Sequence, residues 1–397
     1  MRISTIAMQR LAINAILEQQ RSLSQTQLQV STGKRIINPS DDPLGSQRVL
    51  ELDATLDRLG QFRTNAELAR VRLSLEDNAL SNATQIVQRA RELVIQGSND
   101  TQSPESRALI AAEVRQLADA LLDIANSQNG QGEYLFSGFR SRTQAFSREG
   151  GVVTYNGDQG QRLLKISESR SIADGDHGAT VFMQIPTGNG TFAVSADAAN
   201  TGSGLLVPGA VVDPGAWTAE AYVVRFTAPD AYEVVDSGGA VVVSGAYAPG
   251  QTIAFGGIEV RMEGAPATGD SFNVTPSVNQ DLFATLDALA AVLASSGQGP
   301  AERAQVRSEL NASLANLDQA LGTLLTVRTE VGTRLSTLDT QAQANDEYEL
   351  QLETTRADIR DLDFAEAVGR LNLQLAGLEA AQQTYARLQG LSLFNFL

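Results

Sequence analysis

The only histidine of the chain, His177, stands in a stretch rich in glycine and aspartate, IADGDHGAT. A catalytic triad or a histidine-based metal site would have to use it, because the sequence has no other imidazole and no cysteine. Asp174 and Asp176 are two residues apart and could begin a cation-binding loop. The EF-hand pattern needs further oxygen ligands and a more distant glutamate, and these are missing here. We therefore interpret the stretch as a turn and expect no metal.

Other groups with chemical potential also lack the spacing of a known site. The glycines of NGQGEYLFSG do not open a strand–helix unit with phosphate-binding spacing. Carboxylates are plentiful, but most lie at outward heptad positions, where a solvated helix face explains them. We expect no catalytic residue and no cofactor, and the protein is not expected to be an enzyme.

Charge and composition exclude further classes. The 397-residue chain carries a formal net charge of −16, and the first 150 residues are neutral, so the excess is on the rest. This pattern lacks the basic footprint of a nucleic-acid-binding protein, and an acidic surface argues against anionic membranes. No apolar run approaches the length of a membrane span, and the N-terminus lacks the features of a cleaved signal peptide.

Apolar residues recur every seven positions through residues 52–94. The positions three residues after each member of the row are mostly small or apolar, which is the seam of a coiled coil or long bundle helix. Pro43 suits the first helical position with Asp42 as its cap, and Gly97 suits the end. The row comprises Leu52, Leu59, Ala66, Leu73, Leu80, Val87 and Val94.

The C-terminal third carries a matching row. Its polar member, Asn345, is typical of a seam residue that fixes register. The row comprises Leu310, Leu317, Leu324, Val331, Leu338, Asn345, Leu352 and Ile359.

The period changes between about residues 146 and 277. Runs such as AVVVSGAYA and IEVRMEG are rich in strand-forming residues, with Gly, Pro, Asn and Asp between them. We expect an α+β multidomain fold, in which both chain ends build a long antiparallel α-helical bundle or coiled-coil rod that carries an inserted all-β domain. The expected segments are a terminal helix over 1–37, one half of the rod over 38–145, the β domain over 146–277, the other half over 278–360 and a second terminal helix over 361–397.

Both chain ends have amphipathic seams in which Gln replaces some of the large apolar residues of a stable coiled coil. Such helices are marginal alone, so we expect them to fold fully only on assembly. The alternative is a pair of ordinary helices docked on the rod. The predicted assembly residues are Ile6, Ile13, Ile16, Leu23 and Val30 in the first helix, and Phe364, Val368, Leu371, Leu375, Leu378, Tyr385, Leu393, Phe394, Phe396 and Leu397 at the other end.

The stretch STGKRIINPSDDPLG, residues 31–45, concentrates residues that specify turns. Its prolines disfavour helix at the preceding residues, and its aspartates can cap backbone donors. We predict a rigid corner between the first helix and the rod, although a plain surface loop is the alternative. The predicted corner residues are Gly33, Asn38, Pro39, Asp41, Asp42 and Pro43.

These segments carry a family resemblance. STGKRIINPSDDP, with the N-terminal MRIST, resembles the N-terminal region of the bacterial flagellin superfamily. The paired aspartates between Pro39 and Pro43 are most like the branch of flagellar hook-associated protein 3, as are NGQGEYLFSGFRSRTQAF and YNGDQGQRLLKIS. Residues 255–277 resemble a segment shared by hook-associated proteins, and 361–397, with the ending LSLFNFL, resemble that branch's C-terminus. Residues 178–250 show little similarity.

The resemblance implies a structural protein of the flagellum, exported without cleavage through the flagellar type III apparatus. It implies an axial core domain made of the two terminal helices, and a junction ring or helical array between hook and filament. The implied partners are other copies of the chain, the adjacent hook-associated junction protein, flagellin and an export chaperone that binds the C-terminal region.

Three rival functions fit the sequence less well. Filament flagellin is disfavoured by Pro39, Pro43 and the ending LSLFNFL. An enzyme carried on a secreted rod would need a catalytic cluster within 178–277, which is not evident. A type III needle-tip or translocator protein would not explain the flagellin-like corner at 31–45.

Overall fold

The computed structural model describes residues 5–99, 102–295 and 299–394, with side chains described between residues 7 and 387 of these ranges. The chain forms two compact units. The terminal unit contains the residues up to Thr64 and those from Gln341 onward, and the central unit is Asn65–Thr340. Two long helices, α2 (Pro43–Gly97) and α5 (Pro300–Arg360), contribute to both units.

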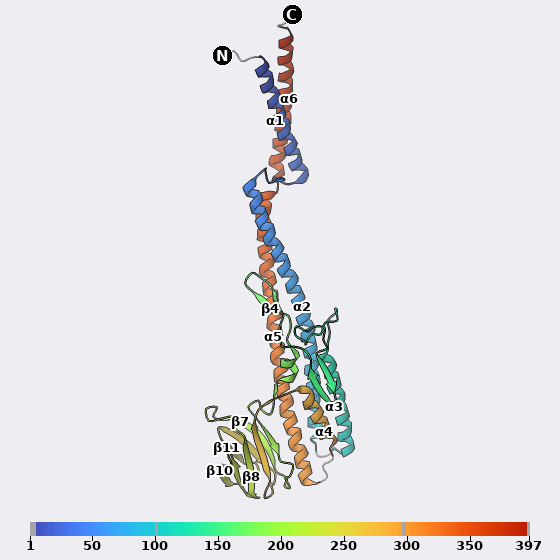
Figure 1. Ribbon diagram of the computed structural model, residues 1–397, viewed down its shortest axis with the longest axis vertical. Coiled ribbons are helices and arrows are strands. Elements are labelled where there is room, and N and C mark those ends of the chain that lie inside the picture. Colours follow the sequence, from blue (N-terminus) through green and yellow to red (C-terminus); the bar gives the residue numbers. More distant parts are fainter. Residues whose placement is uncertain (1–4, 100–101, 296–298, 395–397) are drawn as a thin grey trace. The chain divides into compact units, whose positions relative to one another are not determined.

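In the terminal unit, α1 (Thr5–Thr32) and α6 (Phe364–Phe394) run side by side (Figure 1). The same unit pairs the first part of α2 with the last part of α5 through a cluster of Leu59, Phe62 and Leu352. Pro43 begins α2, as its fixed φ allows, and Asp42 caps it by accepting a hydrogen bond from the Gly45 amide at 2.9 Å.

The central unit packs α2 and α5 with α3 (Pro104–Ala125) and α4 (Leu282–Ala294) around one apolar core. Both predicted heptad rows supply it: Leu73, Leu80 and Val87 of α2 are fully buried, and so are Leu317, Leu324 and Val331 of α5. Ser103 caps α3 through its hydroxyl, which accepts the Ser106 amide at 3.2 Å. The expected helical pattern is therefore confirmed.

The first four strands after α3 form two small antiparallel hairpins, β1–β2 and β3–β4, that belong to this same core. Phe146 and Phe182 are fully buried with Phe283 of α4, and the ring centroids of Phe146 and Phe182 are 5.7 Å apart. The elements are β1 (Phe146–Glu149), β2 (Val152–Tyr155), β3 (Leu163–Lys165), β4 (Ser171–Ala173), the π-helix η1 (Ala179–Met183), β5 (Ile185–Pro186) and its partner β14 (Asn279–Gln280).

A second, separate core lies between a five-stranded sheet, ordered β10-β9-β8-β13-β6, and a three-stranded sheet, ordered β11-β12-β7. Phe192, Phe226 and Phe272 are fully buried or nearly so there. The inserted all-β part with its own core therefore begins at β6, because the earlier strands bury their apolar residues against helices. The strands are β6 (Phe192–Ala196), β7 (Leu205–Val211), β8 (Tyr222–Ala228), β9 (Ala231–Val235), β10 (Val241–Ala246), β11 (Thr252–Phe255), β12 (Ile258–Glu263) and β13 (Ser271–Pro276).

The α+β fold, with helices from both chain ends and inserted sheets, is confirmed. Within the described ranges, no helix combines the length and apolarity that crossing a bilayer requires.

Candidate assembly interface

The face of helix α1 that contacts α6 carries both apolar and polar residues. Of the predicted assembly residues, Ile16, Leu23 and Val30 lie on this inward face and are buried or half-buried. The second inward row consists of Ala12, Gln19, Thr26 and Gly33. Ile13 lies one row further round, with 42% of its surface exposed. The side chain of Ile6 lies outside the described residues.

On helix α6, too, some of the predicted assembly residues face outward instead of toward the partner helix. Leu371, Leu378 and Tyr385 are half-buried on its inward face. The companion row is Ala367, Gln374 and Ala381, whereas the predicted Val368 and Leu375 are 44% and 39% exposed. Phe364, 54% exposed, places its ring beside Gly33. Leu393 and Phe394 have side chains outside the described residues, and Phe396 and Leu397 lie outside them altogether.

The middle of the α1–α6 seam is polar. The side-chain amide of Gln19 donates a hydrogen bond to the backbone carbonyl of Gln374 at 3.2 Å. The side-chain amide of Gln374 donates to the Ser22 hydroxyl at 2.7 Å. Within the described part of the chain, Oε1 of Gln374 is buried without a hydrogen-bond partner, which costs stability. This seam buries less apolar surface than a Leu-rich coiled coil, so the helix pair gains little from its own contact.

Large apolar side chains lie instead on the outer surface of the pair. An exposed apolar surface of this extent usually marks an interaction site. The outward residues are Met8, Leu11, Ile13, Leu17 and Leu28 of α1, and Val368, Leu373 and Leu375 of α6. The arrangement suits helices that are covered by other molecules.

The corner after α1 is fixed by backbone hydrogen bonds. Gly33 has φ +70°, which glycine adopts without strain, and its amide closes α1 on the Gln29 carbonyl. Its carbonyl accepts the Leu362 amide at 3.0 Å, and Arg35 donates to the Ile359 carbonyl at the end of α5. The corner therefore binds the end of α1 to the α5–α6 connection.

Asp41 and Asp42 hold the remaining turn. One Asp41 carboxylate oxygen accepts the amides of Ile37 and Asn38, at 3.1 and 2.9 Å. The Gly45 amide and the Arg35 guanidinium lower the pKa of Asp42 from its ordinary value. Pro39 and Pro43 stand on either side of this pair and limit the backbone further.

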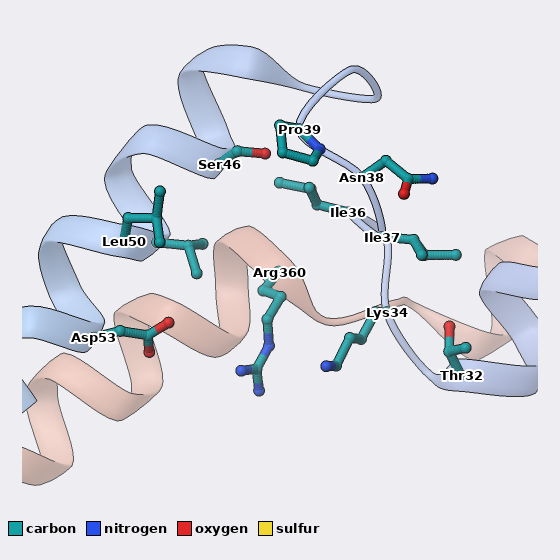
Figure 2. A pocket seen from close by; sticks show the side chains of 11 residues that line it. Thr32, Lys34, Ile36, Ile37, Asn38, Pro39, Ser46, Leu50, Asp53 and Arg360 are labelled. Carbon is teal, nitrogen blue, oxygen red and sulfur yellow. The ribbon is translucent and has the colours of Figure 1, made fainter.

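A groove of about 610 Å³ opens on this corner. Figure 2 shows Pro39 beside Ser46, with Leu50 on the same helix and the side chains of Arg360 and Lys34 below them in the view. Leu50 is 67% exposed, so the groove offers an apolar surface beside two cations.

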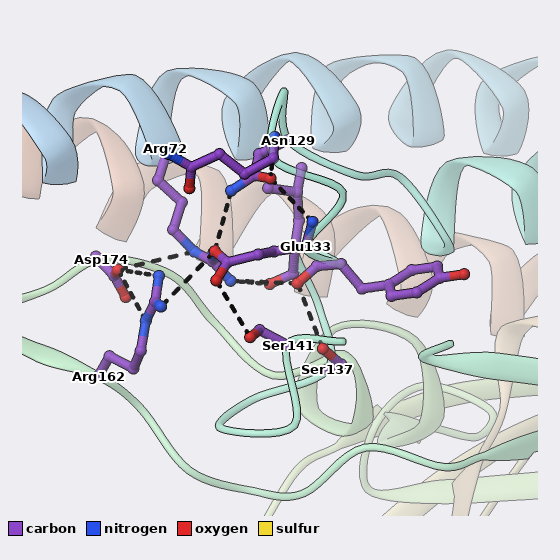
Figure 3. Close-up of polar contacts among 10 residues, drawn as sticks. Arg72, Asn129, Glu133, Ser137, Ser141, Arg162 and Asp174 are labelled. Atoms are coloured by element: carbon purple, nitrogen blue, oxygen red, sulfur yellow. Dashed lines mark hydrogen bonds and ion pairs between the residues drawn. The ribbon is translucent and has the colours of Figure 1, made fainter. Parts of the chain in front are cut away.

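A buried ionic cluster ties loops of the central unit to α2 (Figure 3). Arg72, whose side chain is 8% exposed, pairs with Glu133 at 3.3 Å and with Asp174 at 3.8 Å. It also donates to the carbonyls of Tyr134 and Leu135. Arg162 donates to Asp174 at 2.7 Å. These paired charges fix the loops.

The cluster continues at Glu76 and Asp176. Arg334 donates to both carboxylate oxygens of Asp176, at 2.8 and 3.0 Å. Glu76 accepts the Asp176 amide at 3.0 Å, and burial, reinforced by the Asp176 charge, raises the pKa of Glu76 well above 4.5. Asp174 and Asp176, considered above as cation ligands, are thus held by arginines. His177 contacts the Thr180 hydroxyl.

Sequence reasoning missed this cluster. Its one visible signal is Glu76, a carboxylate in a seam row that is otherwise small or apolar. The partners of Glu76 come from distant segments, so the seam position alone does not identify them.

Comparison with known proteins identifies the relatives of the chain. Residues 3–141 match the bacterial flagellin N-terminal helical region, and residues 314–397 match the bacterial flagellin C-terminal helical region. Flagellar hook-associated protein 3 of Escherichia coli is 26% identical over 396 residues, 100% of this chain and 99% of the relative.

Two solved structures of flagellar proteins are also similar to this chain. FlgL of Xanthomonas campestris is 36% identical with a TM-score of 0.72, over 77% of this chain and 99% of that one. The flagellar junction protein FlgL of Legionella pneumophila is 32% identical with a TM-score of 0.73, over 79% and 100%.

Proposed function

Because the chain belongs to the family of flagellar hook-associated protein 3 (FlgL), we propose that it is a structural adaptor, which joins hook and filament of the bacterial flagellum through its terminal helices. The observation that carries this proposal is the division of residues on α1 and α6. The inward faces hold a row of small and polar residues beside their apolar row, while Leu11, Ile13, Leu17, Val368 and Leu375 face outward.

The mechanism is assembly without catalysis. Copies pack their terminal helix pairs into a ring or helical array, and each outward Leu that becomes buried contributes about 1.5–3 kcal/mol. The corner at Gly33 and Asp42 keeps the pair in a defined connection to α2 and α5. Beyond other copies, the partners are the neighbouring hook-associated protein on one side and flagellin on the other.

The exposed apolar residues of the terminal helices also bear on export. The outward apolar residues of α6 need shielding before assembly, which supports a chaperone that holds the C-terminal region. The route is the flagellar type III apparatus, without cleavage of a signal peptide.

A strain that lacks the gene tests this function. We expect hooks without filaments, and flagellin shed into the medium, with both defects reversed by the full-length chain. A copy number far below that of flagellin distinguishes a junction piece from a filament subunit. Normal filaments on the hooks of the deletion strain would refute the proposal.

A further inference from the structure

The loop after α3 holds one exposed aromatic ring in a fixed position. Phe139 is 62% exposed, although the neighbouring Leu135 and Phe136 are buried in the core. Arg140 and Arg142, also exposed, follow it within three residues. Neither the ionic cluster nor the terminal helices use these three side chains, which we call the Phe139 knob.

Several contacts hold the knob in place. One oxygen of Asp158 accepts the amides of Phe139 and Gly160, at 2.9 and 2.8 Å. The ring lies directly against Gly160, where a Cβ atom would come within 2.0 Å of it. Gly138 adopts φ +69° against the same aspartate. The ring is therefore preorganised while still exposed, and so little entropy is lost when it binds.

Exposed aromatic and arginine side chains are the residue types that dominate protein interfaces. The complementary surface would be apolar at its centre and acidic around it. An acidic occupant also fits this chain, whose net charge of −16 lies outside its first 150 residues.

Such a surface exists on the terminal unit of the same protein. Leu350 of α5 is 66% exposed, and Asp346 and Glu347 precede it by four and three residues. On a helix this spacing places both carboxylates beside the leucine. All three side chains are exposed, and we call them the Leu350 patch.

We infer that the Phe139 knob of one copy docks on the Leu350 patch of a second copy. The inference rests on the proposed function, because it names a contact between neighbouring subunits of the array. Knob and patch are different surfaces, so the contact is head-to-tail and leaves one free knob and one free patch for the next copies. Phe139 covers Leu350 while Arg140 and Arg142 pair with the two carboxylates.

Cysteine cross-linking tests the contact directly, because the natural chain has no cysteine. The full-length variant Phe139→Cys/Leu350→Cys is produced in the deletion strain, and isolated flagella are oxidised with copper phenanthroline. We expect a ladder of products larger than dimers on a non-reducing gel. The control Leu109→Cys/Leu350→Cys, whose first site is 75% exposed on α3, is expected to give no ladder.

The outcomes separate the contact from the function. Attached filaments without a ladder, or a ladder equally strong in the control, would overturn the contact and leave the junction role intact. Failure of the unmodified chain to restore filaments would overturn the junction role itself.

Charge reversal gives a second readout if the cysteine variant does not assemble. Arg140→Glu/Arg142→Glu is expected to lower the fraction of hooks with filaments at least tenfold. Adding Asp346→Arg/Glu347→Arg in the same chain is expected to restore most of it. No loss, or a loss without restoration, would contradict the proposed pairing.

Discussion

Gln374 of α6 donates a hydrogen bond to the hydroxyl of Ser22 of α1 over 2.7 Å, in the middle of the seam between the terminal helices. A stable coiled coil would place large apolar residues at such a position. The pair therefore gains less from its own contact than a Leu-rich coiled coil would, and a second set of large apolar residues, such as Leu11 and Leu375, remains available to neighbouring molecules.

The first prediction concerns the stability of this pair in the free monomer. Residues 5–32 and 364–387 are expected to exchange their amide hydrogens quickly at low protein concentration, because short helices with a polar seam are marginal. Gln374→Leu removes a buried oxygen without a partner in the described structure and adds apolar burial, which together outweigh the lost hydrogen bond to Ser22, so it should stabilise the pair by about 1 kcal/mol. Hydrogen exchange measured by mass spectrometry checks both statements. Strong protection in the unmodified monomer would contradict the account.

The second prediction separates the two faces of α6. Leu375→Asp places a charge on the outward face, and we expect it to abolish incorporation into flagella while the central unit stays folded. Leu109→Asp, the same change at a 75% exposed leucine of α3 in the central unit, is the matched control and should incorporate. Leu371→Asp, on the inward face, should also fail, with loss of the α1–α6 pairing itself. Filament attachment and circular dichroism together distinguish these cases, and normal attachment by both α6 variants would contradict the model.

The third prediction is a pH dependence caused by Glu76. The folded-state pKa of this carboxyl is raised well above 4.5, so the folded protein binds the proton more tightly than the unfolded chain. Stability is therefore lost as the pH rises from 4.5 through the folded-state pKa. Glu76→Gln keeps the size and shape of the side chain but cannot ionise. It should therefore remove this pH-dependent loss of stability and be the more stable form at pH 8. Urea unfolding at pH 5 and pH 8 measures the difference, and parallel pH profiles of the two proteins would refute the assignment.

The fourth prediction tests the corner. Gly33→Ala has room for its Cβ, 3.6 Å from the Phe364 ring, but its φ of +70° strains an L-residue. We expect a loss of about 1 kcal/mol. Gly60→Ala, in the α2 helix of the same unit with open space around its Cβ, should gain about 0.5–1 kcal/mol instead. Thermal unfolding of both variants provides the comparison, and equal effects would contradict a backbone origin.

Periodicity predicted the elements well but not the rotation of the terminal helices. Row by row, Leu73 to Val87 and Leu317 to Val331 are buried as expected, because those rows have one set of partners within the chain. In α1 and α6 the rows that contain Ile13 and Val368 lie outside the pair. A helix that serves both an internal and an external partner has several apolar rows, and sequence spacing does not tell which partner each row meets.

Two other features depended on tertiary contacts. The ionic cluster joins Arg72 and Glu76 to residues some 60 to 100 positions away, and no local pattern links them. The boundary of the second core, at β6 instead of residue 146, depends on where Phe146 and Phe182 find apolar partners. The capping of α2 by Asp42 is local, and the sequence was sufficient to predict it.

The central claim is that the outward face of the terminal helices becomes buried on assembly. The most direct measurement is the maleimide reactivity of a Leu375→Cys variant, the only thiol in its chain. We predict rapid modification of the free monomer and at least tenfold slower modification in isolated flagella. Equal rates in both states would contradict the claim.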